Sequence, residues 1–146
     1  MTKMYYDKDA DIRALAGKTI AILGYGSQGH AQAQNLRDSG VKVIVSELEG
    51  TPNHAQAVKE GFKPLGAAEA AKNADIVHFL LPDEVQAKVY QEAVRPALKK
   101  GMALAFSHGF NIHFGRIVPP GDVDVYMVAP KAVSYTHLTL PTSYSV

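Results

Sequence analysis

The chain has 146 residues, of which 47% are hydrophobic and 20% are charged, with a formal net charge of +1 and no cysteine. This composition is typical of a globular domain large enough to bury a core, and the absence of a basic run argues against a nucleic acid partner. No apolar stretch has membrane-spanning length, the first residues lack a signal-peptide pattern, and disulfide or thiolate chemistry is excluded. We therefore expect one cytoplasmic domain with neither a membrane nor a nucleic acid partner.

Strand and helix signals alternate along the chain after a short leader, in which Asp9–Leu15 can form a turn or two of helix. Apolar or β-branched runs predict strands at Thr19–Leu23, Val41–Val45, Ile76–Leu81, Ala103–Phe106 and Val123–Val128. Helices are predicted over Gln28–Ser39, Asn53–Glu60 with Asn53 as N-cap, Ala67–Lys72, and from Asp83 to Tyr90 or beyond. Five strands with intervening helices predict an α/β fold with a doubly wound parallel sheet, whose ligands bind beyond the carboxyl ends of the strands.

A GxGxxG turn joins the first strand to the first helix within Lys18–Gly29. Gly24 permits the tight turn, Gly26 lets the backbone approach a pyrophosphate, and Gly29 lets the helix pack closely on the sheet. The phosphates would then lie at the positive end of the helix. The GxxxxGK[ST] motif of other phosphate loops occurs nowhere in the chain. We interpret the domain as a Rossmann-type dinucleotide-binding domain, with a purely structural glycine turn as the alternative.

The end of the second strand indicates which dinucleotide is bound. Glu47 follows the glycine turn by about 20 residues, where a carboxylate accepts hydrogen bonds from the ribose hydroxyls and repels a 2′-phosphate. No Arg or Lys occurs between Val43 and Ala57 to clamp such a phosphate. NADH is therefore favoured over NADPH. The alternative is that Glu47 points to solvent, as Glu49 does.

Several motifs, in the correct order, resemble the N-terminal domain of ketol-acid reductoisomerase. They are GYGSQGHAQAQNLRDSG, LLPDEVQ, FSHGFNIHFG, IVPP and DVDVYMVAPK, within Tyr5–Lys131. The resemblance implies reduction coupled to alkyl migration, which converts 2-acetolactate or 2-aceto-2-hydroxybutyrate to 2,3-dihydroxy acids in branched-chain amino acid biosynthesis. It also implies NAD(P)H, magnesium in the complete enzyme, and a homo-oligomer when the enzyme is complete.

The resemblance assigns cofactor contacts as well. Tyr25, Ser27 and Gln28 would line the pyrophosphate and nicotinamide side. The loop after the Ile76–Leu81 strand would approach the cofactor through Pro82, Asp83, Glu84, Val85 and Gln86. Many relatives carry an arginine and two serines for the 2′-phosphate where this chain has Leu48, Thr51 and Asn53. This departure supports NADH, although Thr51 and Asn53 leave dual use open.

His108 and Lys131 are the candidate catalytic residues. His108 directly follows the Ala103–Phe106 strand and matches the family's active-site histidine, which would position or relay a proton near a substrate oxygen. Lys131 matches a lysine that would hold substrate or product charge. Read without the resemblance, His108 could be structural and Lys131 a solvated loop residue. We expect His78 to be a core residue. We assign no metal site, because the spacing of His30, His54 and His113 does not indicate a set of metal ligands.

The end of the chain differs in character from the rest. Val133–Thr142, VSYTHLTLPT, resembles a translated sequencing adaptor, so we expect residues 1–131 to form the domain and Ala132–Val146 to be a non-native tail, with an ordinary edge strand as the alternative. The family's C-terminal helical domain, which supplies the magnesium-binding acids, would then be absent. We therefore expect the chain to bind cofactor at best, without catalysis, and to associate through exposed apolar surface. A β-hydroxyacid dehydrogenase domain and a non-catalytic dinucleotide sensor remain the alternatives.

Overall fold

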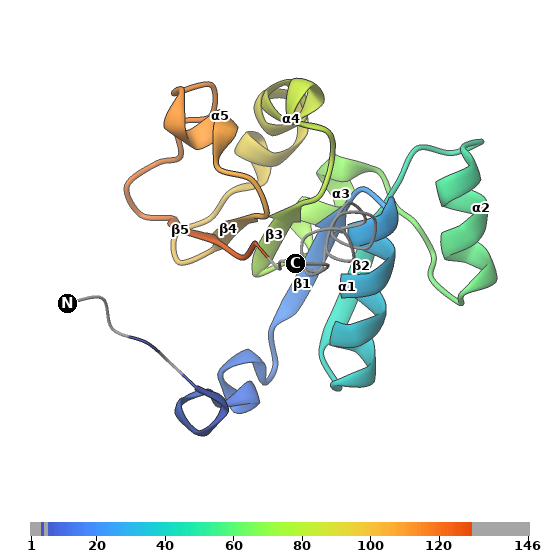
Figure 1. Cartoon of the computed structure of the whole chain (residues 1–146). Helices are drawn as coiled ribbons and strands as arrows, with labels where there is room; N and C mark the ends of the chain where they lie inside the picture. The colour runs from blue at the N-terminus through green and yellow to red at the C-terminus, as the bar shows by residue number, and fades with distance from the viewer. Residues whose placement is uncertain (1–3, 5, 130–146) are drawn as a thin grey trace, which may run out of the picture.

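The computed structural model describes residues 4 and 6–129, in which strands and helices alternate (Figure 1). The strands are β1 (Thr19–Leu23), β2 (Lys42–Ser46), β3 (Ile76–Phe79), β4 (Ala103–Phe106) and β5 (Asp124–Met127). The α-helices are α1 (Ser27–Asp38), α2 (Pro52–Lys59), α3 (Ala67–Lys72), α4 (Asp83–Val89) and α5 (Phe110–His113). A π-helical turn (Tyr90–Val94) and a 3₁₀ turn (Arg95–Ala97) continue α4, and two 3₁₀ turns precede β1 at Asp7–Asp9 and Ile12–Leu15.

The five strands form one parallel sheet in the order β2-β1-β3-β4-β5. An isolated parallel bridge joins Ser46 to Leu65 next to β2, where a further strand of this fold would lie. The chain runs outward from β1 to β2 and then returns across β1 to β3. The predicted doubly wound α/β fold is thereby confirmed, and its topological switch point lies between β1 and β3, which is where such sheets bind ligands.

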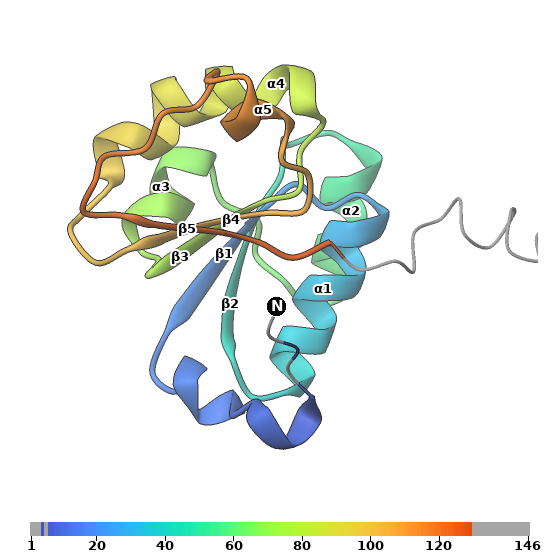
Figure 2. The same ribbon diagram turned by 60° about the vertical axis from the view of Figure 1, so that its left-hand side comes forward.

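Each face of the sheet packs into its own core. Ala21 and Leu23 of β1 belong to a core with α3 and the π-helical turn, whereas Ile20 and Ile22 belong to a core with α1. Figure 2 shows the sheet between α1 on one side and α3 on the other. Because helices cover both faces of β1, all five of its residues are buried, which explains its continuous apolar run.

Several element boundaries differ from the sequence prediction by one or two residues, and one short helix was not predicted. The N-cap of α2 is Thr51 rather than Asn53, and its Oγ1 accepts a hydrogen bond from the His54 amide at 3.1 Å. Pro52 takes the first helical position, where its fixed φ fits and its missing N–H costs nothing. β3 ends at Phe79 instead of Leu81, and α5 was not predicted because four residues carry too little periodicity to be recognised.

His78 lies in β3, between Ile22 and Ala105 of the neighbouring strands. It is 6% exposed, and its Nε2 lies 3.2 Å from the Ser107 hydroxyl oxygen. Burial lowers the pKa of His78 to about 4. The ring is therefore neutral near neutral pH, in agreement with the core role predicted for it.

We predict that His78 makes the fold less stable in mild acid. An unfolded histidine titrates near pH 6.5, so between about pH 6.5 and 4 the unfolded chain binds more protons and the free energy of unfolding falls as the pH drops. The full effect is about 3 kcal/mol at most. Urea unfolding at about pH 7 and about pH 4.5 should show a smaller difference for His78→Gln than for the wild type. An equal difference in both proteins would contradict this prediction.

Candidate functional site

The glycine turn leaves the carboxyl end of β1 and is held against both neighbouring strands. The Gly24 amide donates to the Ser46 carbonyl at 2.9 Å, and Gly24 has a φ of +97°, which favours glycine. A Cβ at Gly24 would lie 2.9 Å from the Leu80 carbonyl oxygen, and one at Gly29 would lie 2.0 Å from the Gly24 oxygen. The fold itself therefore requires glycine at positions 24 and 29.

Gly26 is different, because the fold does not explain it. Its φ is −71°, which any residue adopts, and a Cβ there would meet no atom of the described chain within 4 Å. It is the N-cap of α1, and no side chain caps this helix. The first amides of a helix have no intrahelical partner and attract anions. A small residue at this position leaves that helix end open to a ligand.

Glu47 bends back over the glycine turn instead of pointing to solvent. One carboxylate oxygen accepts the Tyr25 amide at 2.7 Å and the other accepts the Leu48 amide at 2.9 Å. A carboxylate oxygen accepts more than one hydrogen bond, so both retain capacity for a ribose hydroxyl. The charge that ends β2 thus lies beside the turn, as dinucleotide binding in this fold requires.

The side chain of Tyr25 points into the core beneath the turn. It is 2% exposed, and its hydroxyl donates to Glu60 at 2.5 Å. Burial, together with the hydrogen bond and charge of Glu60, raises the pKa of Tyr25. Ser27 and Gln28 begin α1 beside it, and the Gln28 side chain accepts from Gln32. The Tyr25 side chain is thus engaged within the protein, and its cofactor contact stays a prediction.

A polar pocket of about 270 Å³ lies between the turn and the start of α2. Its lining residues are Tyr25, Gly26, Ser27, His30, Pro52, Asn53 and Gln56. Leu48 is 75% exposed nearby and brings no charge. The Thr51 hydroxyl donates its proton to the Leu48 carbonyl at 2.8 Å, so no hydroxyl proton is left for a phosphate oxygen.

The loops after β3 and β4 meet through Asp83 and His108. The Nδ1 of His108 lies 2.9 Å from an Asp83 carboxylate oxygen, and the two side chains are 68% and 33% exposed respectively. Pro82 is the N-cap of α4, and Glu84 and Val85 lie exposed in its first turn. His108 is thereby accessible, with a carboxylate against one of its ring nitrogens.

The buried side chains of Gln86 and Asn111 connect these two loops through hydrogen bonds. The Gln86 amide donates to the Leu81 carbonyl at 2.8 Å and to Asp83 at 3.2 Å, and Gln86 is 3% exposed. Asn111 is fully buried, donates to the Asp83 carbonyl at 2.9 Å, and has an Oδ1 with no partner among the described residues. Sequence reasoning missed Asn111, although it lies within the HGFN motif. The cofactor contact of Gln86 stays a prediction.

Some sequence predictions lie beyond the part of the chain that the structure describes. Lys131 and the tail from Ala132 to Val146 are among them. Within residues 4 and 6–129, no three His, Asp or Glu side chains come close enough to hold a metal ion. In the same residues, no helix has the length and apolar character that crossing a bilayer requires.

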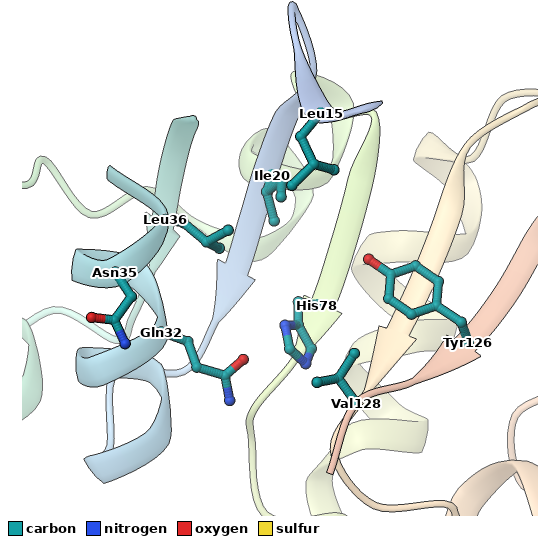
Figure 3. Close-up of a pocket in the computed structure, with 8 residues that line it drawn as sticks. All are labelled: Leu15, Ile20, Gln32, Asn35, Leu36, His78, Tyr126 and Val128. Carbon is teal, nitrogen blue, oxygen red and sulfur yellow. The ribbon is translucent and has the colours of Figure 1, made fainter. Parts of the chain in front are cut away.

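A larger cavity, of about 520 Å³, opens on the α1 face of the sheet (Figure 3). His78 lies between the side chains of α1 and those of β5 and its continuation, and the lining residues are Leu15, Ile20, Gln32, Asn35, Leu36, His78, Tyr126 and Val128. Tyr126 and Val128 are 40% and 47% exposed. This groove is mostly apolar, and it reaches the strand ends at Val128, which follows β5, and at His78, whose Nε2 lies 3.2 Å from the hydroxyl oxygen of Ser107 beside His108. We regard it as an uncovered part of the sheet face.

Comparison with known proteins gives one family. Residues 14–139 match the model of the acetohydroxy acid isomeroreductase NADPH-binding domain. A structure of an NADH-preferring ketol-acid reductoisomerase from an uncultured archaeon is 51% identical, with a TM-score of 0.84 over 90% of this chain. The chain covers 41% of that structure's length. The family match runs past residue 131, where the sequence analysis places the end of the domain.

More distant structures share the fold alone. An NAD-binding semialdehyde dehydrogenase from Cupriavidus necator, solved with calcium and NAD, is 19% identical with a TM-score of 0.67, over 82% of this chain and 46% of its own. A 3-hydroxyisobutyrate dehydrogenase from Mycobacterium tuberculosis, solved with L-serine, is 22% identical with a TM-score of 0.61, over 77% and 40% respectively. The β-hydroxyacid dehydrogenase alternative therefore receives support for its architecture but not for its chemistry.

We predict that Gly29→Ala prevents stable folding, because its Cβ would overlap the Gly24 carbonyl oxygen. The expected loss is about 3 kcal/mol or more, the range of severe backbone and packing defects. Gly66→Ala is the matched control, since Gly66 has a φ of −65° and open space around it. Thermal unfolding followed by circular dichroism should show a large loss for Gly29→Ala and a change within about 1 kcal/mol for the control.

Proposed function

Because this chain belongs to the ketol-acid reductoisomerase family, we propose that its described residues bind a nicotinamide dinucleotide across the carboxyl ends of β1, β2 and β3. Gly26 is the observation that carries this proposal. Neither the backbone geometry nor the packing requires glycine at this position, and the absence of a side chain leaves the amides at the start of α1 accessible. Gly66 is an equally open N-cap, so what distinguishes Gly26 is its place in the glycine turn between β1 and α1, where this fold binds a pyrophosphate.

We propose NADH as the preferred dinucleotide. Glu47 offers the ribose a carboxylate, which accepts from hydroxyls and repels a phosphate. Leu48 provides no cation, and the Thr51 hydroxyl already donates its proton within the chain. The 51% identical structure is of an enzyme described as NADH-preferring, which supports the same choice.

For the complete protein we propose the family reaction on 2-acetolactate or 2-aceto-2-hydroxybutyrate. The bound dinucleotide would supply the hydride. Asp83 faces Nδ1 of His108, and a lone pair there would be repelled by the carboxylate, so the proton of the neutral ring resides on Nδ1. The Nε2 atom is then left to accept or return a proton at a substrate oxygen. Lys131 remains our candidate for holding substrate charge.

Magnesium takes no part in the steps we assign to these residues. The described residues contain no set of ligands for it. The acids that polarise the substrate in this family would come from outside the matched domain.

We predict that Gly26→Ala folds normally and yet loses dinucleotide binding. No atom of the described chain opposes the added Cβ, whereas a pyrophosphate in contact with this backbone would. Titration with NADH, followed by nicotinamide fluorescence, should show affinity reduced by about tenfold or more, the effect of one buried clash or lost charge-assisted contact. An unchanged melting temperature would show that the fold is intact. Equal NADH affinity in Gly26→Ala and in the wild type would contradict the proposed pyrophosphate site at Gly26.

We also predict that this chain does not by itself turn over substrate. Purified chain mixed with magnesium, acetolactate and NADH should oxidise no NADH beyond the protein-free background, because no three acidic or histidine side chains of the described part come close enough to hold a metal ion. Turnover that disappears in His108→Ala would contradict this expectation.

A further inference from the structure

Four side chains beneath the glycine turn form a hydrogen-bonded group, and three of the four have no role in the contacts proposed so far. We name it the Glu60 cluster: Tyr25, His30, Gln56 and Glu60. The Tyr25 hydroxyl donates to Oε2 of Glu60 at 2.5 Å, and His30 Nε2 lies 2.8 Å from Oε1. Gln56 donates to Oε1 as well. One carboxylate is therefore shared by three neighbours.

The three partners of Glu60 come from three different elements. Tyr25 belongs to the glycine turn, His30 to α1 and Gln56 to α2, while Glu60 is the residue that ends α2. The same three partners line the pocket of about 270 Å³. Glu60 thus connects the side of the pocket formed by the glycine turn and α1 to the side formed by α2.

Packing keeps the cluster in place. The Tyr25 ring meets the His30 and Phe62 rings edge-on, each with centroids 5.6 Å apart. Arg37 lies over the Phe62 ring at 4.7 Å and donates to the Glu60 carbonyl at 2.7 Å. The Glu60 carboxylate is consequently held at a fixed position, with a side chain that is 18% exposed.

The cluster places a negative charge behind the pocket. The hydrogen bond from Tyr25 holds the pKa of Glu60 below its usual value, against the raising effect of burial. The charged or titratable groups around it are His30 and Arg37 of α1 and the Tyr25 hydroxyl. Arg37 is engaged with the Glu60 backbone carbonyl, and the Tyr25 and Gln56 side chains of the pocket wall carry no positive charge. His30, which also lines the pocket, faces the Glu60 carboxylate through its Nε2.

We propose that Glu60 is a positioning residue of the dinucleotide pocket and that its charge disfavours a 2′-phosphate there. In this fold the acid that ends β2 marks the ribose, and the pocket adjoins that ribose at the start of α2. A phosphate entering it would approach a second carboxylate, in addition to Glu47, behind the side chains of Tyr25 and Gln56, and like charges repel. This inference rests on the proposed dinucleotide binding and adds a residue to its specificity.

Two substitutions separate the two parts of the proposal. Tyr25→Phe removes an anchor without changing charge, so NADH and NADPH should both bind several-fold more weakly, with their ratio unchanged. Glu60→Gln keeps the shape and removes the charge, so the affinity for NADPH relative to NADH should rise by about tenfold. Glu69→Gln, an exposed glutamate on α3, is the matched control and should leave both affinities unchanged.

The experiment is a titration of each purified variant with NADH and with NADPH, together with amide hydrogen exchange of residues 24–29 in the free protein. Exchange there should be faster by about tenfold in Tyr25→Phe, because a hydrogen bond to a charged group is lost. An NADPH-to-NADH ratio in Glu60→Gln equal to that of the wild type would overturn the charge role. If Glu60→Gln does not fold, unchanged exchange in Tyr25→Phe would overturn the positioning role.

Failure of the proposed function has a different signature. If the wild-type chain binds neither NADH nor NADPH, dinucleotide binding itself is wrong. The exchange measurement on the free protein still decides whether the cluster positions the turn.

Discussion

The approach of α1 to the end of β1 is the constraint on which the rest of the site depends. A helix that packs with its third residue against the Gly24 carbonyl has no room for a Cβ at Gly29. The same approach places the uncapped amides of α1 at the edge where β1, β2 and β3 end. Glu47 can then reach across to the turn, and Leu80 can close against Gly24. One close contact between helix and strand therefore determines where several polar groups meet.

Much of the fold could be predicted from the sequence because its signals are local. Each strand is a short apolar run, and Gly40 and Gly61, both with positive φ, follow the ends of α1 and α2. Where prediction erred, a competing local preference decided the outcome, as when Pro52 moved the N-cap from Asn53 to Thr51. The Ser46–Leu65 bridge was not predicted because a single paired residue leaves no periodic pattern.

The sequence does not reveal the side-chain directions of the candidate site residues. The family resemblance predicts cofactor contacts for Tyr25 and Gln86, and both side chains are buried and hydrogen-bonded within the protein. Spacing says nothing about whether a residue in a turn points outward or inward, because that depends on partners distant in sequence. Glu60 lies 35 residues from Tyr25, and Asn111 lies 25 from Gln86. Such pairs become visible only when the sheet brings their loops together.

The groove of Figure 3 lies on a sheet face, whereas the glycine turn, Glu47 and His108 lie along a sheet edge. No residue lining the groove also lines the polar pocket, although helix α1 contributes side chains to both. Substitutions far apart with no shared partners generally act independently. Tyr126 and Val128 do not meet that condition, because Tyr126 also lines a pocket with Gly109 and His113, which follow β4, and Val128 donates its amide to Phe106 at the end of β4. A protein engineer therefore has to treat that face and the ligand end of the sheet as coupled.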